Sequence, residues 1–148
     1  MKKDLIIILI GILVIAAIVA FLAWRGPAEG TPTDLVEVVK ESGLIVKDVV
    51  LGSGKEARAG DTVAVHYVGR FEDGTIFDTS LNTGNPLAFV LGQGYVIPGW
   101  EEGLLGMKPG GVRKLTIPPD LAYGEAGIGT IPPNTTLHFE VELLEIQN

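Results

Sequence analysis

The sequence predicts an α+β domain, in which one antiparallel β-sheet wraps around one short α-helix, preceded by a single transmembrane helix. Three observations support this prediction. An apolar segment without charges lies near the start of the chain. Short apolar runs separated by Gly and Pro follow it, as in mostly β domains. Only residues 99–105 carry the start and stop signals of a soluble helix. The 148 residues leave room for one domain and an appendage.

Residues 5–23 are long enough to span a bilayer. These nineteen residues read LIIILIGILVIAAIVAFLA and carry no charge. As a helix at ~1.5 Å per residue they cover about 28 Å, close to the ~30 Å thickness of the hydrocarbon core. A secretory signal peptide also begins with basic residues, but its apolar stretch has roughly 7–15 residues. The sequence therefore favours an uncleaved signal-anchor at 1–25 over a cleaved signal peptide.

The charges around this segment predict its orientation. Lys2, Lys3 and the free amino group precede it, whereas only Arg25 lies close behind it. Trp24 occupies the interfacial position that amphipathic aromatic rings prefer. Because basic residues stay on the cytoplasmic side, we expect a single-pass membrane protein with a cytoplasmic N-terminus and an extracytoplasmic folded domain.

The composition excludes several classes of function for the part beyond Arg25. That part has 8 basic and 17 acidic residues, a net charge of −9, whereas nucleic acid and anionic lipid need basic patches. The chain has no cysteine, and its two histidines, His66 and His138, fall on strand faces opposite the apolar residues. Gly92-Gln93-Gly94 lacks the third glycine of a dinucleotide-binding loop. We therefore expect no metal, no cofactor and no nucleic-acid partner.

A linker at 26–42 connects the anchor to the folded domain at 43–148. Residues 26–33 read GPAEGTPT and have no core of their own. Residues 34–42 (DLVEVVKES) fit either a short helix or a first edge strand, and the pattern does not decide between them.

Five or six short strands are predicted within the domain. The strand at 62–71 alternates best, because every second residue from Val63 to Phe71 is apolar, aromatic or glycine. Asp73-Gly74 is a strong turn signal after it. The predicted strands cover 44–51, 62–71, 75–80, 87–91, 112–117 and 135–146.

The predicted helix at about 99–105 is bounded by helix-breaking residues. Pro98 sits at its start, and Gly106 and Pro109 bring it to an end. The last strand then places Leu137 and Phe139 on the inward face. Together these elements predict one sheet packed on one helix.

Five motifs occur in an order that resembles one known family. They are VHYVG at 65–69, DGTIFDTS at 73–80, VIPGWEEG at 96–103, LAYG at 121–124 and IPPNTTL at 131–137. In these motifs the chain resembles the FKBP family of peptidyl-prolyl isomerases, the macrolide-binding immunophilins. The resemblance covers about 43–148, and implies a twisted antiparallel sheet around one short helix with an apolar pocket between them.

The resemblance also implies a role for each pocket residue. Trp100 would form the floor on which a proline ring rests. Val96 and Ile97 would line the entrance, and the Ile97 N–H and the Tyr123 hydroxyl would donate hydrogen bonds to substrate carbonyls. The implied catalytic residues are Asp78, Ile97, Trp100 and Tyr123, and the implied substrate-binding residues are Tyr67, Phe77, Phe89, Val96, Ile131 and Phe139.

Two roles for Asp78 remain open in the sequence, besides a purely local one. It could interact with the carbonyl of the substrate's X-Pro bond as that bond twists, or it could orient Tyr67. The local alternative is an Asx turn with Thr79 and Ser80. The chain also departs from the family pattern. Leu87 stands where an aromatic residue is common, so we expect one wall of the pocket to be aliphatic. The loop from Tyr123 to Ile131 is about one residue shorter than in the best-known members.

The resulting hypothesis is a membrane-anchored peptidyl-prolyl cis-trans isomerase that assists the folding of exported proteins. We expect proline-containing polypeptides as partners, macrolides as inhibitors, and a monomer. The alternative is a membrane-anchored binding module or scaffold that recognises proline-containing segments, with isomerase activity incidental.

Overall fold

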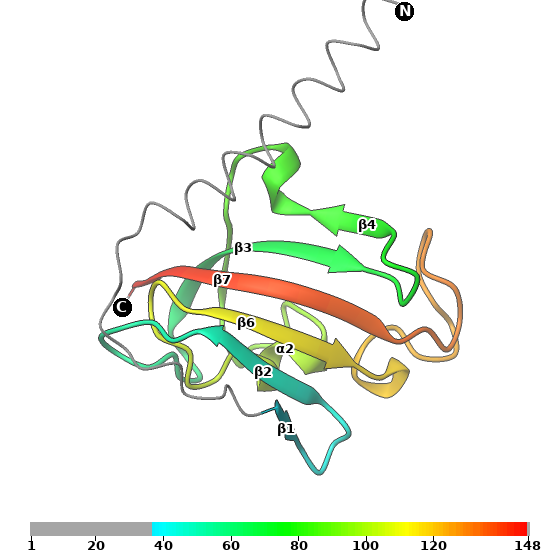
Figure 1. Cartoon of the computed structure of the whole chain (residues 1–148), viewed down its shortest axis with the longest axis horizontal. Helices are drawn as coiled ribbons and strands as arrows, with labels where there is room; N and C mark the ends of the chain where they lie inside the picture. Colours follow the sequence, from blue (N-terminus) through cyan, green and yellow to red (C-terminus); the bar gives the residue numbers. More distant parts are fainter. Residues whose placement is uncertain (1–36, 148) are drawn as a thin grey trace, which may run out of the picture. The chain divides into compact units, whose positions relative to one another are not determined.

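The computed structural model describes residues 37–147, which form one seven-stranded antiparallel sheet and one α-helix (Figure 1). This confirms the predicted architecture of a sheet with one short helix. No helix within residues 37–147 is long and apolar enough to cross a bilayer. The predicted anchor at 1–25 lies outside the described residues.

The strands run β1-β2-β6-β7-β3-β4 across the sheet, and β5 pairs with β3. Every pairing is antiparallel. The strands are β1 (Glu37–Val39), β2 (Ile45–Val50), β3 (Thr62–Arg70), β4 (Ile76–Thr79), β5 (Leu87–Val90), β6 (Val112–Ile117) and β7 (Leu137–Gln147). The helix is α2 (Pro98–Gly103), and two 3₁₀ turns, η1 (Ser80–Asn82) and η2 (Pro119–Leu121), lie in the connections.

Strand β1 answers the question that the sequence left open at 34–42. Within this range, residues 37–39 form an edge strand whose Val38 pairs with Val46 of β2. The sheet therefore reaches into the range assigned to the linker. The side chains of Val38 and Val39 are exposed, so burial gives this strand no alternating pattern that the sequence could reveal.

A β-bulge in β7 allows both ends of the strand to face the core. Val65 of β3 pairs with Leu143, whereas its neighbour Ala64 pairs with Glu145, so Leu144 is the extra residue. Simple alternation after Leu143 would place Glu145 on the core face. The bulge instead turns Ile146 to the core and leaves Leu144 exposed.

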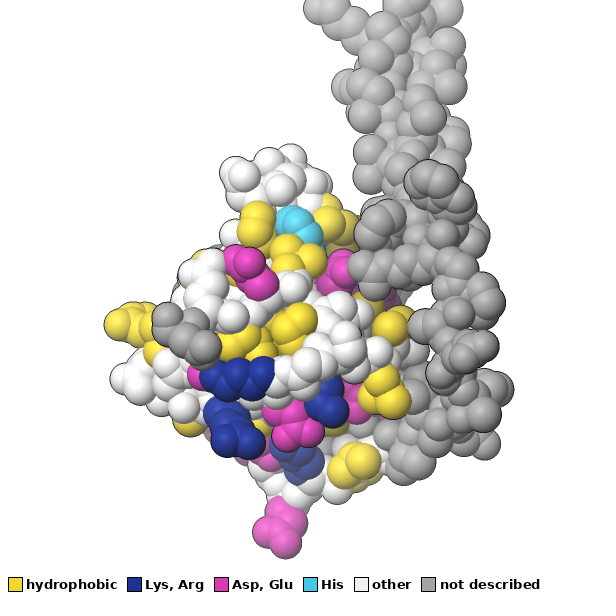
Figure 2. All heavy atoms as spheres, turned by 90° about the vertical axis from the view of Figure 1, so that its left-hand side faces the viewer, with side chains coloured by type: hydrophobic (Ala, Val, Ile, Leu, Met, Phe, Trp, Pro, Cys, Tyr) yellow, Lys and Arg dark blue, Asp and Glu magenta, His cyan; other side chains and the backbone are white. Residues whose placement is uncertain are grey.

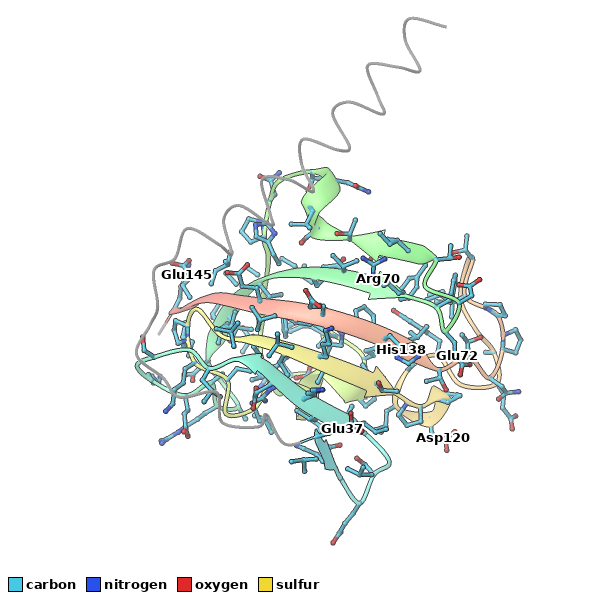
Figure 3. The ribbon with its side chains drawn as sticks, in the orientation of Figure 1. Glu37, Arg70, Glu72, Asp120, His138 and Glu145 are labelled. Carbon is cyan, nitrogen blue, oxygen red and sulfur yellow. The ribbon has the colours of Figure 1, made fainter. Side chains whose placement is uncertain are left out.

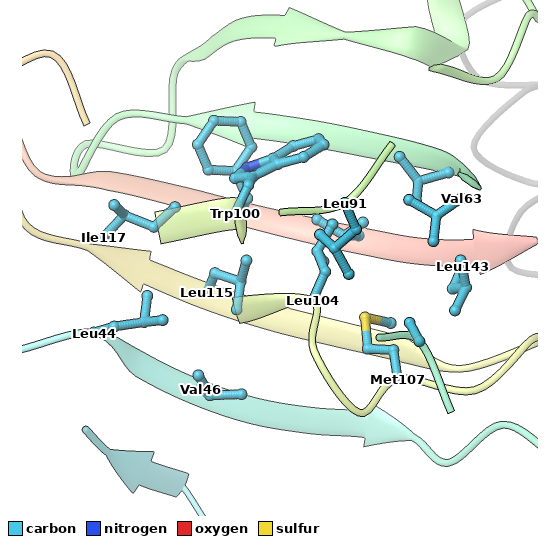
Figure 4. Packing of buried hydrophobic residues seen from close by; sticks show 14 of the residues in the cluster. Leu44, Val46, Val63, Leu91, Trp100, Leu104, Met107, Leu115, Ile117 and Leu143 are labelled. Atoms are coloured by element: carbon cyan, nitrogen blue, oxygen red, sulfur yellow. The ribbon is translucent and has the colours of Figure 1, made fainter. Parts of the chain in front are cut away.

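Helix α2 packs closely on β6 because two glycines face the sheet. Figure 4 shows Leu115 and Ile117 of β6 next to this helix. A Cβ on Gly99 would lie 2.8 Å from Cδ1 of Ile117, and a Cβ on Gly103 would lie 2.8 Å from both δ-carbons of Leu115. Leu115 and Ile117 are fully buried beneath the helix. The helix runs from Pro98 to Gly103, so it begins one residue before the predicted start at 99 and ends two residues before the predicted end at 105.

Arg113 ties the end of the helix to the sheet. Its Nη1 donates to the carbonyl oxygens of Gly103 and Leu105 at 2.8 and 2.9 Å. Its Nε and Nη2 donate to the two carboxylate oxygens of Asp48 on β2, at 2.7 and 3.1 Å. The Arg113 side chain is 11% exposed, so this pair is less screened than the pairs at the surface.

On the face shown in Figure 2, basic and acidic side chains lie side by side.

Both histidines are half-buried on the face of the sheet away from the core. His66 Nδ1 lies 3.0 Å from the Ser80 hydroxyl. His138, labelled in Figure 3 on β7, has Nδ1 3.2 Å from the Thr116 hydroxyl. Each histidine therefore has a local hydroxyl partner, and neither lines the aromatic pocket described below.

The contact between Gly103 and Leu115 gives a direct test of the packing. We expect Gly103→Ala to lower the free energy of unfolding by about 1–2 kcal/mol, because the added methyl overpacks the interface. In a Leu115→Ala background the δ-carbons are gone, so the same substitution should be neutral or stabilising. Urea unfolding of the four proteins measures this coupling. Equal costs in both backgrounds would contradict the proposed contact.

Candidate active site

A pocket of about 150 Å³ opens on one side of the sheet, next to helix α2. Its lining residues are aromatic or aliphatic apart from Asp78, the one charged lining residue within the described part of the chain. The lining residues are Tyr67, Phe77, Asp78, Leu87, Tyr95, Val96, Ile97, Trp100, Tyr123 and Phe139.

A larger hollow of about 240 Å³ lies elsewhere, and its chemistry is different. Its charged side chains include Asp48 and Arg113, which already pair with each other. Glu56 and Lys108, also in its lining, lie 3.7 Å apart. The aromatic pocket is therefore the better candidate site, because ligand sites are mostly apolar with a few placed polar groups.

The structure brings together all but two of the predicted site residues. Phe89 and Ile131 are 8% and 9% exposed and do not line the pocket. The Phe89 ring instead packs against Trp100, with the ring centroids 6.0 Å apart. Two lining residues stand outside the predicted catalytic and substrate-binding sets: Leu87, which was expected only as an aliphatic wall, and Tyr95. Tyr95 directly precedes Val96 in sequence, which is the one local signal that could have indicated it.

Trp100 forms the floor of the pocket and is 3% exposed. Pro98 opens the helix, so Trp100 stands in the first turn, between the two glycines that face the sheet. The rings of Tyr67 and Phe139 meet the indole nearly edge to face, with centroids 5.0 and 5.2 Å away. The buried indole N–H has no hydrogen-bond partner within residues 37–147. Such unpaired donors are rare, so aromatic packing takes precedence over polar pairing at this floor.

Gly69 allows the aromatic wall to close. Phe77 and Phe139 lie edge to face, with centroids 5.5 Å apart and planes at 88°. A Cβ on Gly69 would lie 2.7 Å from the Phe77 ring and 2.8 Å from the Phe139 ring. Any side chain at this position would therefore push the two rings apart.

Asp78 holds the hydroxyl of Tyr67. The phenol O–H donates to Asp78 Oδ2 at 2.7 Å. The backbone of Tyr67 is also fixed, since its N–H donates to the Ser80 hydroxyl at 2.9 Å and its carbonyl accepts from the Thr79 hydroxyl at 2.7 Å. The local turn uses Thr79 instead of Asp78, because the Leu81 N–H donates to the Thr79 hydroxyl. Of the alternatives for Asp78, this geometry favours orientation of Tyr67.

Two donors at the pocket have no partner among the described residues. The backbone N–H of Ile97 makes no hydrogen bond within residues 37–147, although its carbonyl accepts from Trp100 N and Glu101 N at 2.9 and 3.2 Å. The Tyr123 hydroxyl likewise has no protein partner in that range, and Tyr123 lines the pocket. Two free donors beside an apolar floor can receive two carbonyl oxygens of a bound peptide.

The pairing of Tyr67 with Asp78 predicts an alkaline effect on stability. Burial, and then the hydrogen bond to Asp78 and its charge, raise the pKa of Tyr67 above that of a free tyrosine. The stabilisation is therefore complete below about pH 10, where an unfolded tyrosine stays protonated, and is lost as the pH rises further.

We accordingly expect Tyr67→Phe to lose less stability than the wild type on going from neutral to alkaline pH. Urea unfolding at a series of pH values measures this difference, and phenolate absorbance shows whether a late-ionising tyrosine disappears. Identical alkaline profiles for the two proteins would show that the Tyr67 hydroxyl is not held as described.

Comparison with known proteins places the chain in a family. The sequence profile described as FKBP-type peptidyl-prolyl cis-trans isomerase matches residues 53–144. FK506-binding protein 2 of Yarrowia lipolytica is 48% identical over 136 residues, covering 91% of this chain and 93% of that protein. The FK506-binding protein of Neisseria meningitidis serogroup B is 55% identical over 105 residues, covering 70% and 96%.

A solved structure shows the same fold. The crystal structure of FkpA from Escherichia coli is 46% identical with a TM-score of 0.71, and the match covers 81% of this chain but 54% of that one. Sequence profile, relatives and fold all point to the same family. The chain therefore belongs to the FKBP-type peptidyl-prolyl cis-trans isomerases, enzymes that catalyse rotation about X-Pro peptide bonds.

Proposed function

We propose that this isomerase catalyses X-Pro rotation in the Trp100 pocket, with the Ile97 N–H and the Tyr123 hydroxyl as donors to the substrate. The observation that carries this proposal is the pair of donors beside the buried indole that have no partner within residues 37–147. The proline ring would rest on Trp100, between the rings of Tyr67 and Phe139 that meet the indole.

The chemistry of rotation explains why such a site is sufficient. Amide resonance gives a barrier of about 18–20 kcal/mol, so uncatalysed exchange takes on the order of tens to hundreds of seconds. In the twisted transition state that resonance is lost, and the bond becomes less polar than the planar amide. A pocket that excludes water therefore favours the twisted state over the ground state, which is the condition for a rate increase.

The donors supply orientation, while Asp78 acts through Tyr67. Two hydrogen bonds to carbonyls that flank the proline hold the bond near the twisted geometry. Asp78 accepts a hydrogen bond from the Tyr67 hydroxyl at 2.7 Å and so keeps the Tyr67 ring against Trp100. No step requires a nucleophile or a proton transfer.

We expect Tyr123→Phe to lower kcat/KM up to about tenfold, because one hydrogen bond is worth about 1 kcal/mol and 1.4 kcal/mol is a factor of ten. Asp78→Val, which frees the Tyr67 hydroxyl, should lower it by a similar factor. NMR exchange on an X-Pro peptide measures both rates, using the full chain in nonionic detergent.

Glu145→Gln is the matched control for these variants. Glu145 is exposed on β7 and does not line the pocket; Figure 3 labels it. Its substitution should therefore leave the rate unchanged. If the unmodified protein exchanges the peptide no faster than the uncatalysed background, the activity is overturned. If both pocket variants keep the rate of the unmodified protein, the proposed residue roles are overturned.

We further propose that the enzyme is tethered to a membrane and works on exported proteins. The apolar segment 5–23 would be the anchor, and the basic residues before it would keep the N-terminus cytoplasmic. Proline-containing segments near the outer face of the bilayer would then be its substrates. Because two relatives are named FK506-binding proteins, we also propose that the pocket takes macrolides, which inhibition of the exchange rate would test.

The absence of cysteine from the chain makes the orientation testable. Ser53→Cys places a thiol at an exposed position of the domain, and Lys3→Cys places one before the anchor. In spheroplasts that express the full chain, a membrane-impermeant maleimide should label only the first variant, and lysis should expose the second. The reverse labelling would contradict the orientation, and release from carbonate-washed membranes would contradict the anchor.

A further inference from the structure

The loop between β5 and α2 is closed by a carboxylate from the helix. Gly94 N–H donates to Glu101 Oε1 at 2.8 Å, and Gly92 N–H donates to Glu101 Oε2. Gly92-Gln93-Gly94 was too incomplete to predict a phosphate-binding loop. The structure shows that the backbone N–H groups of its two glycines nevertheless bind an anion, the carboxylate of Glu101.

Both glycines are required by the path of this loop. Gly92 and Gly94 have φ values of 83° and 75°, a region that other residues rarely adopt. Gly92 also lies close to residue 59, since a Cβ there would be 2.9 Å from the Ala59 Cβ. These constraints give the two N–H groups a shared direction, in which one carboxylate can accept from both.

The ends of the loop are held by other contacts, so Glu101 restrains its middle. At the start, Leu91 N–H donates to the Asp61 carbonyl at 2.9 Å, and the Leu91 carbonyl accepts from Gly60 N–H at 2.8 Å. At the end, the Ile97 carbonyl accepts from the first turn of the helix. Residues 92–96 between these points have only the two bonds to Glu101 among the hydrogen bonds within the described chain.

This restrained segment forms the mouth of the pocket. Tyr95, Val96 and Ile97 follow Gly94 directly, and all three line the pocket. Tyr95 is 73% exposed, so packing alone does not fix it. Trp100 and Glu101 are consecutive in the first turn of the helix. Trp100 forms the floor of the pocket, and Glu101 holds the loop that forms its mouth.

We propose that Glu101 is a positioning residue of the isomerase site, which holds the 92–96 loop so that the Ile97 N–H and the neighbouring wall meet the substrate. The inference rests on the proposed use of this pocket. Without the carboxylate, two backbone donors lose their acceptor and two glycines gain conformational freedom. The mouth then occupies its binding geometry for a smaller fraction of the time, which weakens substrate binding by that fraction.

The decisive variant is Glu101→Gln, which has nearly the same shape. Its amide oxygen can accept from one glycine N–H, but its NH₂ group then faces the other, donor against donor. We expect kcat/KM for an X-Pro peptide to fall about tenfold, mainly through a higher KM, because the wall contacts substrate before and during rotation. Glu102→Gln is the matched control, since Glu102 pairs instead with Ser42 at 3.0 Å and Lys40 at 3.7 Å.

Two further measurements separate positioning from stability. The amide resonances of Gly92, Gly94 and Ile97 should shift in Glu101→Gln and remain in place in Glu102→Gln. Urea midpoints should stay close to that of the wild type. A fall in kcat/KM that only follows a loss of folded protein would overturn the proposal, as would an unchanged KM alongside shifted glycine resonances.

Failure of this inference can be distinguished from failure of the proposed site. If Tyr123→Phe and Asp78→Val lose activity while Glu101→Gln retains the wild-type kcat/KM, the site stands and the role of Glu101 is wrong. If Tyr123→Phe and Asp78→Val keep the wild-type rate, the proposed site itself is wrong, and the role of Glu101 is then wrong too.

Discussion

The close approach of helix α2 to strand β6 determines where the floor of the pocket lies. Gly99 and Gly103 present no Cβ to the sheet, so the helix backbone rests directly on Ile117 and Leu115. Trp100 stands between these glycines, and at this depth its indole reaches the rings of Tyr67 and Phe139. A wider separation would leave a gap under the indole, and dispersion contacts weaken steeply with distance. The position of one aromatic ring therefore depends on two residues that have no side chain.

The rest of the site divides into a rigid apolar part and a polar edge. The Phe77 and Phe139 rings meet edge to face, the Tyr67 ring is tilted against Phe139 at 58°, and Gly69 makes room for Phe77 and Phe139. The polar edge is set by single contacts, such as Asp78 with the Tyr67 hydroxyl and Glu101 with the loop beside Ile97. This division suits a reaction in which no group is transferred, because exclusion of water and orientation are the main requirements.

Strong local signals explain which elements were predicted well. Strand β6 was found at 112–117, as predicted, because glycines precede it and two prolines follow it. The Asp73-Gly74 turn was also confirmed, with Gly74 at a φ of 87°. Strand β1 could not be predicted, because its three residues are exposed and exist as a strand only through pairing with β2. The bulge at Leu144 was missed for a related reason, since its cause is the register with β3.

The sequence alone determined the family, the number and order of most elements and eight of the pocket residues, because these follow from motifs, turn residues and alternation along the chain. The tertiary structure decided which apolar and aromatic residues reach the cavity surface. Phe89 and Ile131 lie in the core beside it, whereas Leu87 and Tyr95 line it. It also decided that Glu101 faces Gly92 and Gly94. Exposure and side-chain direction in a loop depend on neighbours distant in sequence, and periodicity along one segment does not encode them.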